Sequence, residues 1–398
     1  MKILITTDCY TPMINGVVTS ILNLETQLRR LGHEVKILCP SENFHCCESE
    51  NVYRIGSVGV GKIYCGARAA FRISQNNLQK LIDWCPDIIH SQSEFTSFIM
   101  AKRIAAEVNC PLVHTYHTVY ENYTHYFSLS ITLGRKAVVM MTKRILHNTE
   151  AVIAPSSKIK KMLKNYGVEQ PIKVIPTGLR LNQFSEGIPV STIDELKDEL
   201  GIPLKSRVLI TVGRAAKEKN IDELIRYFKR LDMENTVLVI VGGGPYLDTL
   251  KELAFAENIS DKVIFTGAVE PENIAAYYRL GDIFLSASQS ETQGLTYIEA
   301  LASGLPAVCR RDDCLNGVIT DGKNGGQYTS FEEFSELIET FLVNDELYKN
   351  MSENAVSKAQ KYSAEKFAKD VETVYMEVLE KRNHYEIANT FYNCENCS

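Results

Sequence analysis

Residues 286–306 read SASQSETQGLTYIEALASGLP, and this stretch decides the fold. It continues an apolar run at 282–286, passes through small polar residues, and ends with apolar residues at helical spacing. The order predicts a strand, a loop and a helix. Gly294 lets backbone N–H groups at the helix start approach an anion, with the carboxylates of Glu291 and Glu299 on either side. This pattern fits a ligand with phosphate at its centre and hydroxyl groups at both ends, such as a nucleotide sugar.

The length and charge distribution of the chain indicate its domain organisation and the kind of surface it meets. A chain of 398 residues is too long for one ordinary core, so we expect two domains. Residues 1–185 contain 21 Lys+Arg and 13 Asp+Glu, a net charge of +8, whereas the remainder carries −14. This asymmetry indicates that the first half meets an anionic surface, either nucleic acid or a membrane. No recognised nucleic-acid motif accompanies the charge, which favours the membrane.

The ends of the chain and its cysteines indicate a compartment. No apolar run approaches the roughly 20 residues that span a bilayer, and the N-terminal segment is typical of a first strand rather than of a signal peptide. Most of the 11 cysteines are scattered singly through apolar segments, so we expect reduced thiols in a cytoplasmic protein. Cys394 and Cys397 form a lone C-x-x-C pair, which is a weak zinc signal.

Short β-rich runs alternate with helical patterns in both halves. The predicted strands are 3–6, 35–39, 87–90, 112–115, 151–154, 173–175, 208–211, 237–241, 263–266, 283–286 and 307–309. The alternation predicts an α/β fold with two doubly wound, Rossmann-like parallel sheets. With a linker at 183–192, the domains are 1–185 and 186–362, and a helix and tail at 363–398 return to the first domain. Such sheets bind ligands beyond the carboxyl ends of their strands, here in a cleft between the domains.

Several residues of the predicted loops suit an anionic ligand. Gly213, Arg214 and Lys219 follow the first strand of the second half, where arginine and lysine can reach one diphosphate; solvated loop charges are the alternative. Val269 follows the third strand of that half, where its backbone can pair with a base edge. Gly16 opens a helix after the first strand of the chain, either to admit a phosphate or sugar or simply to make a turn.

Histidines and tyrosines cluster after one strand of the first half. His114 alternates with apolar residues, so we interpret it as a satisfied core histidine. His117 lies beyond the strand's end, where loops carry function. Tyr120, Tyr123 and His125 follow, and such amphipathic side chains line both sugar sites and membrane interfaces.

Residues 134–147 have the pattern of a basic amphipathic helix, with Arg135, Lys136, Lys143 and Arg144 beside an apolar stripe. We expect the stripe to pack on its own sheet. Each basic residue near an anionic leaflet contributes about 1 kcal/mol, so several together support peripheral attachment.

Taken in order, these residues resemble the family 4 retaining glycosyltransferases of the GT-B fold. The resemblance extends to about residue 379 and rests on Gly16, Gly213-Arg214, Lys219-Asn220, the glycine-rich 242–245, 265–267 and the stretch from Glu291 through Glu299 to Pro306. Within that family, 114–126 and 288–297 are most similar to the bacterial diacylglycerol α-glucosyltransferases, which make monoglucosyldiacylglycerol from UDP-glucose.

The resemblance implies a donor site in the interdomain cleft. Arg214 and Lys219 would neutralise the UDP diphosphate and the leaving-group charge. Glu299 would bind the ribose hydroxyls, and Glu291 the hydroxyls of the donor sugar. The remaining donor-side positions would be Gly16, Gly213, Val269, Gly294 and Leu295.

The resemblance also implies the reaction. His117 would lie beside the sugar and the acceptor oxygen, and transfer would retain the anomeric configuration, the departing phosphate taking the acceptor proton. No metal or other cofactor is expected, because Arg214 and Lys219 supply the positive charge. Thr292 and Gln293 replace the commoner Gly-Phe of the broader family, a difference shared with the lipid glucosyltransferases, and 178–180 also departs from its pattern.

We therefore expect glucose transfer from UDP-glucose to the free hydroxyl of diacylglycerol by a peripheral protein on the inner face of the cell membrane. One alternative is a family member with another donor, such as GDP-mannose, or another acceptor, such as phosphatidylinositol or a soluble sugar. A non-catalytic nucleotide-binding scaffold is an alternative of a different class.

Overall fold

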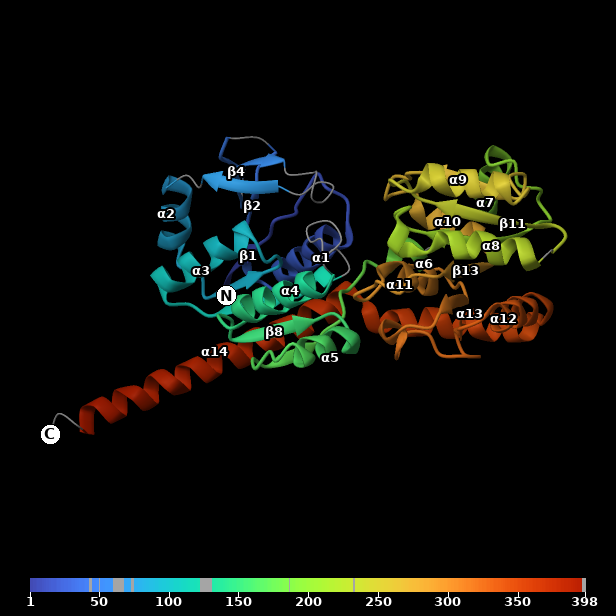
Figure 1. Ribbon diagram of the computed structural model, residues 1–398. Helices are drawn as coiled ribbons and strands as arrows, with labels where there is room; N and C mark the ends of the chain where they lie inside the picture. The colour runs from blue at the N-terminus through green and yellow to red at the C-terminus, as the bar shows by residue number, and fades with distance from the viewer. Residues whose placement is uncertain are drawn as a thin grey trace. The chain divides into compact units, whose positions relative to one another are not determined.

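The computed structural model describes residues 1–42, 45–49, 51–59, 68–72, 75–121, 131–185, 187–231 and 233–395. The chain forms two compact units (Figure 1): unit 1 contains Met1–Gly178 and Ala364–Ser398, and unit 2 contains Leu179–Ser363. The border therefore precedes the predicted linker. That linker, 183–192, instead carries helix α6 (Asn182–Ser185) and the start of helix α7 (Val190–Glu199).

Unit 1 is built on a mainly parallel sheet. Its strands are β1 (Lys2–Thr6), β2 (Glu34–Pro40), β3 (Cys47–Ser49), β4 (Val52–Gly59), β5 (Arg68–Arg72), β6 (Ile88–Ser91), β7 (Leu112–Thr115), β8 (Ala151–Ala154) and β9 (Ile172–Val174). The order is β3-β4-β2-β1-β6-β7-β8-β9, with β5 paired to β4. β3 and β5 are antiparallel to β4, whereas β1 pairs in parallel with both β2 and β6. The direction of strand succession therefore reverses between β1 and β6.

Helices cover this sheet. They are α1 (Gly16–Arg30), α2 (Gln75–Trp84), α3 (Thr96–Val108), α4 (Ile131–Leu146), α5 (Ser157–Asn165) and α14 (Ala364–Glu395). The side chain of Asn15 caps α1 by accepting hydrogen bonds from the N–H groups of Val17 and Val18, both at 3.0 Å. α14 packs against α1 through the buried core of unit 1, and its last turns extend beyond the rest of that unit (Figure 1). The packed part of α14, near the end of the chain, thus stabilises α1, near its beginning.

Unit 2 is built on a parallel sheet. Its strands are β10 (Arg207–Val212), β11 (Thr236–Val241), β12 (Val263–Gly267), β13 (Ile283–Ser286), β14 (Ala307–Arg310) and β15 (Gly325–Tyr328). The order is β12-β11-β10-β13-β14-β15, so strand succession reverses between β10 and β13. β11 is buried along its whole length, as expected of a strand covered on both faces. The two parallel sheets confirm the predicted α/β architecture.

Helices pack against the strands of this sheet. Besides α6 and α7 they are α8 (Ile221–Leu231), α9 (Leu247–Ala256), α10 (Ile274–Leu280), α11 (Leu295–Ala302), α12 (Phe331–Val343) and α13 (Asp345–Ala359), with short 3-10 turns η2 (Lys217–Lys219), η3 (Asp313–Leu315) and η4 (Gln360–Tyr362). The strand, loop and helix predicted for 286–306 are confirmed by β13 and α11.

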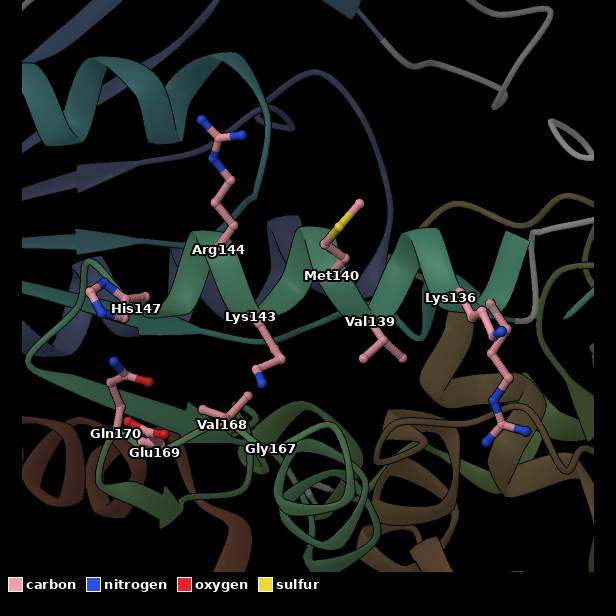
Figure 2. Close-up of a pocket in the computed structure, with 11 residues that line it drawn as sticks. Lys136, Val139, Met140, Lys143, Arg144, His147, Gly167, Val168, Glu169 and Gln170 are labelled. Carbon is pink, nitrogen blue, oxygen red and sulfur yellow. The ribbon is translucent and has the colours of Figure 1, made fainter. Parts of the chain in front are cut away.

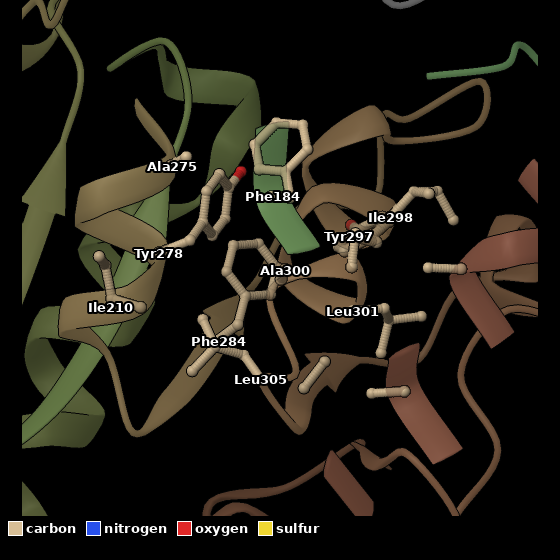
Figure 3. Close-up of a cluster of buried hydrophobic side chains, with 14 of the residues drawn as sticks. Phe184, Ile210, Ala275, Tyr278, Phe284, Tyr297, Ile298, Ala300, Leu301 and Leu305 are labelled. Carbon is tan, nitrogen blue, oxygen red and sulfur yellow. The ribbon is translucent and has the colours of Figure 1, made fainter. Parts of the chain in front are cut away.

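Aromatic side chains fill the core beneath α11 (Figure 3). The rings of Phe184 and Tyr278 meet edge to face with centroids 5.8 Å apart, and those of Phe284 and Tyr297 do so at 6.0 Å. Such contacts add to the free energy gained by burial and favour one arrangement of the rings. The helix that carries Glu299 therefore rests on a well-defined base.

Candidate active site

Glycines allow two loops to pack backbone against backbone at the carboxyl edge of the unit 2 sheet. A Cβ atom on Gly242 would lie 2.0 Å from the carbonyl oxygen of Gly213, and one on Gly244 would lie 2.3 Å from that of Ala215. Both positions need glycine, because any side chain would overlap the neighbouring backbone. The loop that begins at Gly213 is thereby fixed next to β11.

Lys219 and Glu291, which are 72 residues apart in the chain, form an ion pair at this edge. Lys219 lies on η2, and Glu291 lies in the loop between β13 and α11. The Ser290 hydroxyl also donates a hydrogen bond to the backbone carbonyl of Glu218, at 3.2 Å. The structure thus brings together two residues predicted to bind the donor, at the point where the strand order reverses.

Arg214 forms an ion pair with Glu218, a residue that the sequence analysis did not single out. The side chain of Arg214 remains 39% exposed, so its guanidinium is oriented by Glu218 while staying open to a ligand. Because the Glu218 backbone is tied to Ser290, this pair and the Lys219–Glu291 pair belong to one connected set of loops. Glu218 could have been recognised from the sequence, because it lies four residues after Arg214, a spacing at which opposite charges often pair.

Gly294 precedes α11 with a φ of 77°, which favours glycine. A Cβ atom there would lie 2.2 Å from the ring of Tyr297. α11 begins at Leu295, and Gly294 supplies no side chain to cap it. Its first N–H groups therefore suit an anion, although contact of Gly294 and Leu295 with phosphate stays a prediction.

Glu299 lies about one turn into α11 and is oriented by Tyr278. The buried tyrosine hydroxyl donates a hydrogen bond to Oε2 of Glu299 at 2.7 Å. Burial raises the pKa of Glu299, and the hydrogen bond from Tyr278 offsets part of that rise. Tyr278 belongs to α10 and Glu299 to α11, and because the contact joins two separate helices, the role of Tyr278 was not evident from the sequence. Val269 packs at the margin of the same core, and its pairing with a base stays a prediction.

His117 lies at the carboxyl edge of the unit 1 sheet, after β7. Its Nε2 is 2.7 Å from Oε1 of Gln92, which follows β6. Burial, helped by nearby His114, lowers the pKa of His117 to about 3, so the imidazole is neutral at physiological pH. A neutral imidazole can bind a hydroxyl group but contributes no positive charge.

Gly16 starts α1 in the same unit, as predicted from the sequence.

His114 is fully buried, but it is not the satisfied core histidine that its sequence position indicated. Within the described ranges, neither of its ring nitrogens forms a hydrogen bond. Its Nε2 lies 3.4 Å from Oε1 of Glu94, whose other carboxylate oxygen accepts a hydrogen bond from the Tyr120 hydroxyl. Apolar neighbours in the sequence correctly indicated burial but did not indicate the carboxylate beside the ring.

A second carboxyl group, that of Asp8, lies at the end of β1. Burial raises its pKa to about 6, although the backbone N–H groups of Phe95 and Ser97 donate hydrogen bonds to it at 3.1 and 2.9 Å. Asp8 and Glu94 follow the two strands between which the strand order reverses. That position is the signal by which both could have been found in the sequence.

The four basic residues predicted to face a membrane line one cavity of about 790 Å³ beside α4 (Figure 2). They are Arg135, Lys136, Lys143 and Arg144. Figure 2 shows Lys143 pointing toward 167–170, whereas Arg144 points to the other side of the helix. The basic side chains of α4 therefore do not form a single stripe along the helix.

The predicted apolar stripe of α4 is only partly buried. Val138 and Leu146 lie in the interior, whereas Met140 is 70% exposed. Next to the helix, Glu121 forms an ion pair with Arg135 at 3.0 Å. α4 thus combines an anchored inner face with an exposed surface that is both basic and apolar.

Some predictions fall outside the described residues. Tyr123, His125 and Cys397 are among them. In the part of the chain that the structure covers, no group of three or more His, Cys, Asp or Glu side chains is arranged to hold a metal ion. Over the same ranges, no helix has both the length and the apolar character needed to cross a bilayer.

Comparisons with known proteins agree with this architecture. The family model described as Glycosyltransferase Family 4 matches residues 14–183, and the one described as Glycosyl transferases group 1 matches residues 192–358. The solved structure of Anabaena Alr3699/HepE in complex with UDP-glucose superposes with a TM-score of 0.74 at 17% identity, covering 95% of this chain and 100% of that one. This similarity concerns the fold, which is that of the GT-B glycosyltransferases.

Two relatives are similar over nearly the whole chain. The alpha-monoglucosyldiacylglycerol synthase of Streptococcus pneumoniae is 37% identical over 388 residues, 96% of this chain and 87% of the relative. The protein of the same name from Acholeplasma laidlawii is 33% identical over 393 residues, 96% of this chain and 98% of the relative. The chain belongs to the family 4 glycosyltransferases of the GT-B fold.

Proposed function

We propose that the protein transfers glucose from UDP-glucose to the free hydroxyl of 1,2-diacylglycerol at a membrane surface, giving an α-glucosyl glycolipid. The main structural support is the Lys219–Glu291 pair at the carboxyl edge of the unit 2 sheet, beside Arg214. The names of the two relatives and the UDP-glucose bound to the Anabaena protein support the choice of substrates.

The donor binds by exchanging partners with the charged loops of unit 2. The diphosphate competes with the Glu291 carboxylate for the Lys219 ammonium and with Glu218 for the Arg214 guanidinium. When Lys219 turns to phosphate, Glu291 exchanges this contact for hydrogen bonds from the hydroxyls of the glucose. Glu299, held by Tyr278, accepts them from the ribose.

The chemical step retains the anomeric configuration. The bond between the glucose C1 and the phosphate oxygen breaks, a bond from C1 to the acceptor oxygen forms on the same face, and the departing phosphate takes the acceptor proton. Arg214 and Lys219 stabilise the charge that develops on the phosphate, so no metal ion is needed. Neutral His117 binds a hydroxyl of the sugar or the acceptor through hydrogen bonding.

The acceptor reaches the protein through unit 1. The basic residues around α4 attract an anionic leaflet, and exposed apolar residues such as Leu133 and Met140, at 67% and 70% exposure, contact its surface. We place the protein on the inner face of the cell membrane, where UDP-glucose and diacylglycerol meet.

The test is to incubate the purified full-length protein with radiolabelled UDP-glucose and anionic vesicles that contain diacylglycerol. We expect a labelled α-glucosyl lipid, formed equally well when EDTA is present. Parallel reactions contain GDP-mannose, phosphatidylinositol or soluble sugars. Absence of the labelled lipid while one of these is turned over would refute the substrate assignment, and loss of activity in EDTA would refute metal independence.

A further inference from the structure

Glu94 is a buried carboxylate for which the reaction described above provides no role. It follows β6, beside β1, where the strand order of the unit 1 sheet reverses. Parallel sheets bind ligands beyond the strand ends at such a point. Its side chain is 4% exposed, and burial of a carboxylate is costly unless its oxygens are paired. The contacts of the Glu94 carboxylate therefore indicate its role.

Tyr120 is the principal partner of Glu94. The tyrosine hydroxyl donates a hydrogen bond to Oε2, whereas Oε1 faces Nε2 of His114 at 3.4 Å without a hydrogen bond. Among the described residues, no lysine or arginine forms an ion pair with Glu94. An ordinary structural salt bridge thus does not account for the carboxylate, and its strongest contact is to a tyrosine on the neighbouring loop.

Tyr120 in turn supports an exposed apolar surface. Its ring meets that of Phe95 edge to face, with centroids 5.6 Å apart. The Phe95 backbone is held by the Asp8 carboxyl group, yet its side chain is 50% exposed, and that of Ile99, one turn along α3, is 61% exposed. Apolar side chains that are held rigidly but left open to solvent are typical of a contact surface.

The position of Tyr120 in the chain indicates what this surface contacts. His117, at the sheet edge, lies three residues before it, and the next residue, Glu121, binds Arg135 of the basic helix α4. Tyr120 therefore belongs to the segment that joins the neutral imidazole to the membrane-facing helix. An acceptor with a hydroxyl at one end and apolar chains at the other requires an uncharged surface along that segment.

We infer that Glu94 is a positioning residue for the acceptor. By holding the Tyr120 hydroxyl, it fixes the Phe95–Tyr120 pair as the apolar wall along which the glycerol end of a diacyl acceptor lies. Phe95 and Tyr120 contact the acceptor, whereas Glu94 acts through Tyr120. The identity of the acceptor rests on the proposed function; the positioning role rests on the contacts of Glu94.

The experiment measures the KM for diacylglycerol in vesicles and, separately, the KM for UDP-glucose, with the full-length protein. Tyr120→Phe removes one hydrogen bond to a carboxylate and should raise the KM for diacylglycerol roughly three- to tenfold, leaving the KM for UDP-glucose unchanged. Glu94→Ala should have the same effect, and the double variant should be no worse than either single variant. Glu94→Gln should retain most of the wild-type KM, because its amide oxygen can still accept from Tyr120.

Tyr116→Phe is the matched control. It removes a buried hydroxyl from the same segment, one that contacts Thr142 and not Glu94, so it should leave the KM for diacylglycerol unchanged. An unchanged acceptor KM in Tyr120→Phe would overturn the inference, as would an equal rise in the donor KM. Failure of Glu94→Gln to retain the wild-type KM would also overturn it, since the charge itself would then be required. If Glu94→Ala does not fold, Tyr120→Phe decides.

The two proposals fail in different ways. If the wild-type protein does not turn over diacylglycerol, the proposed function is refuted. The Tyr120→Phe comparison is then made with the acceptor that the wild type does use. A raised KM for that acceptor supports the positioning role of Glu94, and an unchanged KM overturns it.

Discussion

The carboxyl edges of the two sheets carry different chemistry, although both lie where the strand order reverses. In unit 2, half-exposed cations are matched by carboxylates from the neighbouring turns: Lys219 by Glu291, and Arg214 by Glu218. In unit 1, the corresponding edge contains the buried carboxyl group of Asp8 and a neutral histidine, as well as buried polar atoms that form no hydrogen bond in the described chain.

This difference indicates what each edge can bind. Ion pairs that are open to solvent can exchange partners with a charged ligand at modest cost, because the charges are already partly desolvated and oriented. A buried edge that holds carboxyl groups and a neutral imidazole disfavours an anionic ligand such as a diphosphate but suits a hydroxyl group, which can both donate and accept a hydrogen bond. We therefore propose that the charged donor binds to unit 2 and the uncharged acceptor to unit 1.

The largest effect should come from removing the cation of the unit 2 edge. Lys219→Ala removes the ammonium that pairs with Glu291 and leaves the departing phosphate without it, so kcat should fall at least about 10²- to 10³-fold. Steady-state kinetics with UDP-glucose measures this. Lys217→Ala removes an exposed lysine from the same turn and should retain activity. Equal losses in the two variants would show that general charge, and not the pair with Glu291, is what matters.

The buried Asp8 carboxyl group of unit 1 should make the free energy of unfolding depend on pH. Because the folded state raises the pKa of Asp8 from 3.8 to about 6, it holds the proton more tightly than the unfolded chain does. The stabilisation that the folded state gains from binding this proton is fully present below pH 4 and is lost as the pH rises through 6. The loss lowers the free energy of unfolding by up to about 3 kcal/mol.

Asp8→Asn removes this titration. Urea unfolding at pH 4 and pH 7 should therefore show that the stability of the variant relative to wild type increases with pH. A difference between the two proteins that is constant over this range would mean that the Asp8 carboxyl group is not buried as described.

A third variant tests how the donor's ribose end is held. Tyr278→Phe removes the hydrogen bond to Glu299, and the KM for UDP-glucose should rise about tenfold. The same bond partly offsets the rise in the pKa of Glu299, so its loss should raise that pKa further. The acidic limb of the kcat/KM profile should then move to higher pH, since Glu299 accepts hydrogen bonds best when ionised. A raised KM with an unmoved limb would exclude Glu299 as the group that titrates.

The sequence predicted the strand–loop–helix of 286–306 well, because a buried parallel strand is a continuous apolar run and a glycine marks the turn before the helix. β15 was missed, since it begins with two glycines that weaken the strand pattern. The linker at 183–192 was wrong because Pro189 is the N-cap residue of α7, which begins at Val190: proline is tolerated at a helix start and interrupts only a helix interior.

The two halves of the site were predictable to different degrees. Lys219 and Glu291 lie in loops that follow strands of one parallel sheet, so their meeting follows from the topology. The pairings of Tyr278 with Glu299 and of Tyr120 with Glu94 join separate elements through buried hydroxyl groups. Such contacts depend on side-chain packing, which periodicity does not reveal.

The smallest effect should come from single charges on α4. Lys143→Ala should weaken binding to anionic vesicles about fivefold, since one lysine near such a surface contributes about 1 kcal/mol. Cosedimentation with vesicles measures this, and the effect should disappear at high salt. Lys349→Ala removes an exposed lysine from α13 of unit 2 as the control. Equal weakening in both would indicate attraction by overall charge instead of by α4.

The division of labour between the two edges can be tested most directly by binding UDP-glucose alone. Isothermal titration without acceptor compares the wild type, Lys219→Ala and Glu94→Gln. We predict that Lys219→Ala loses at least tenfold in affinity and that Glu94→Gln binds as the wild type does. Loss of donor affinity in Glu94→Gln comparable to that in Lys219→Ala would contradict the assignment of donor and acceptor to separate edges.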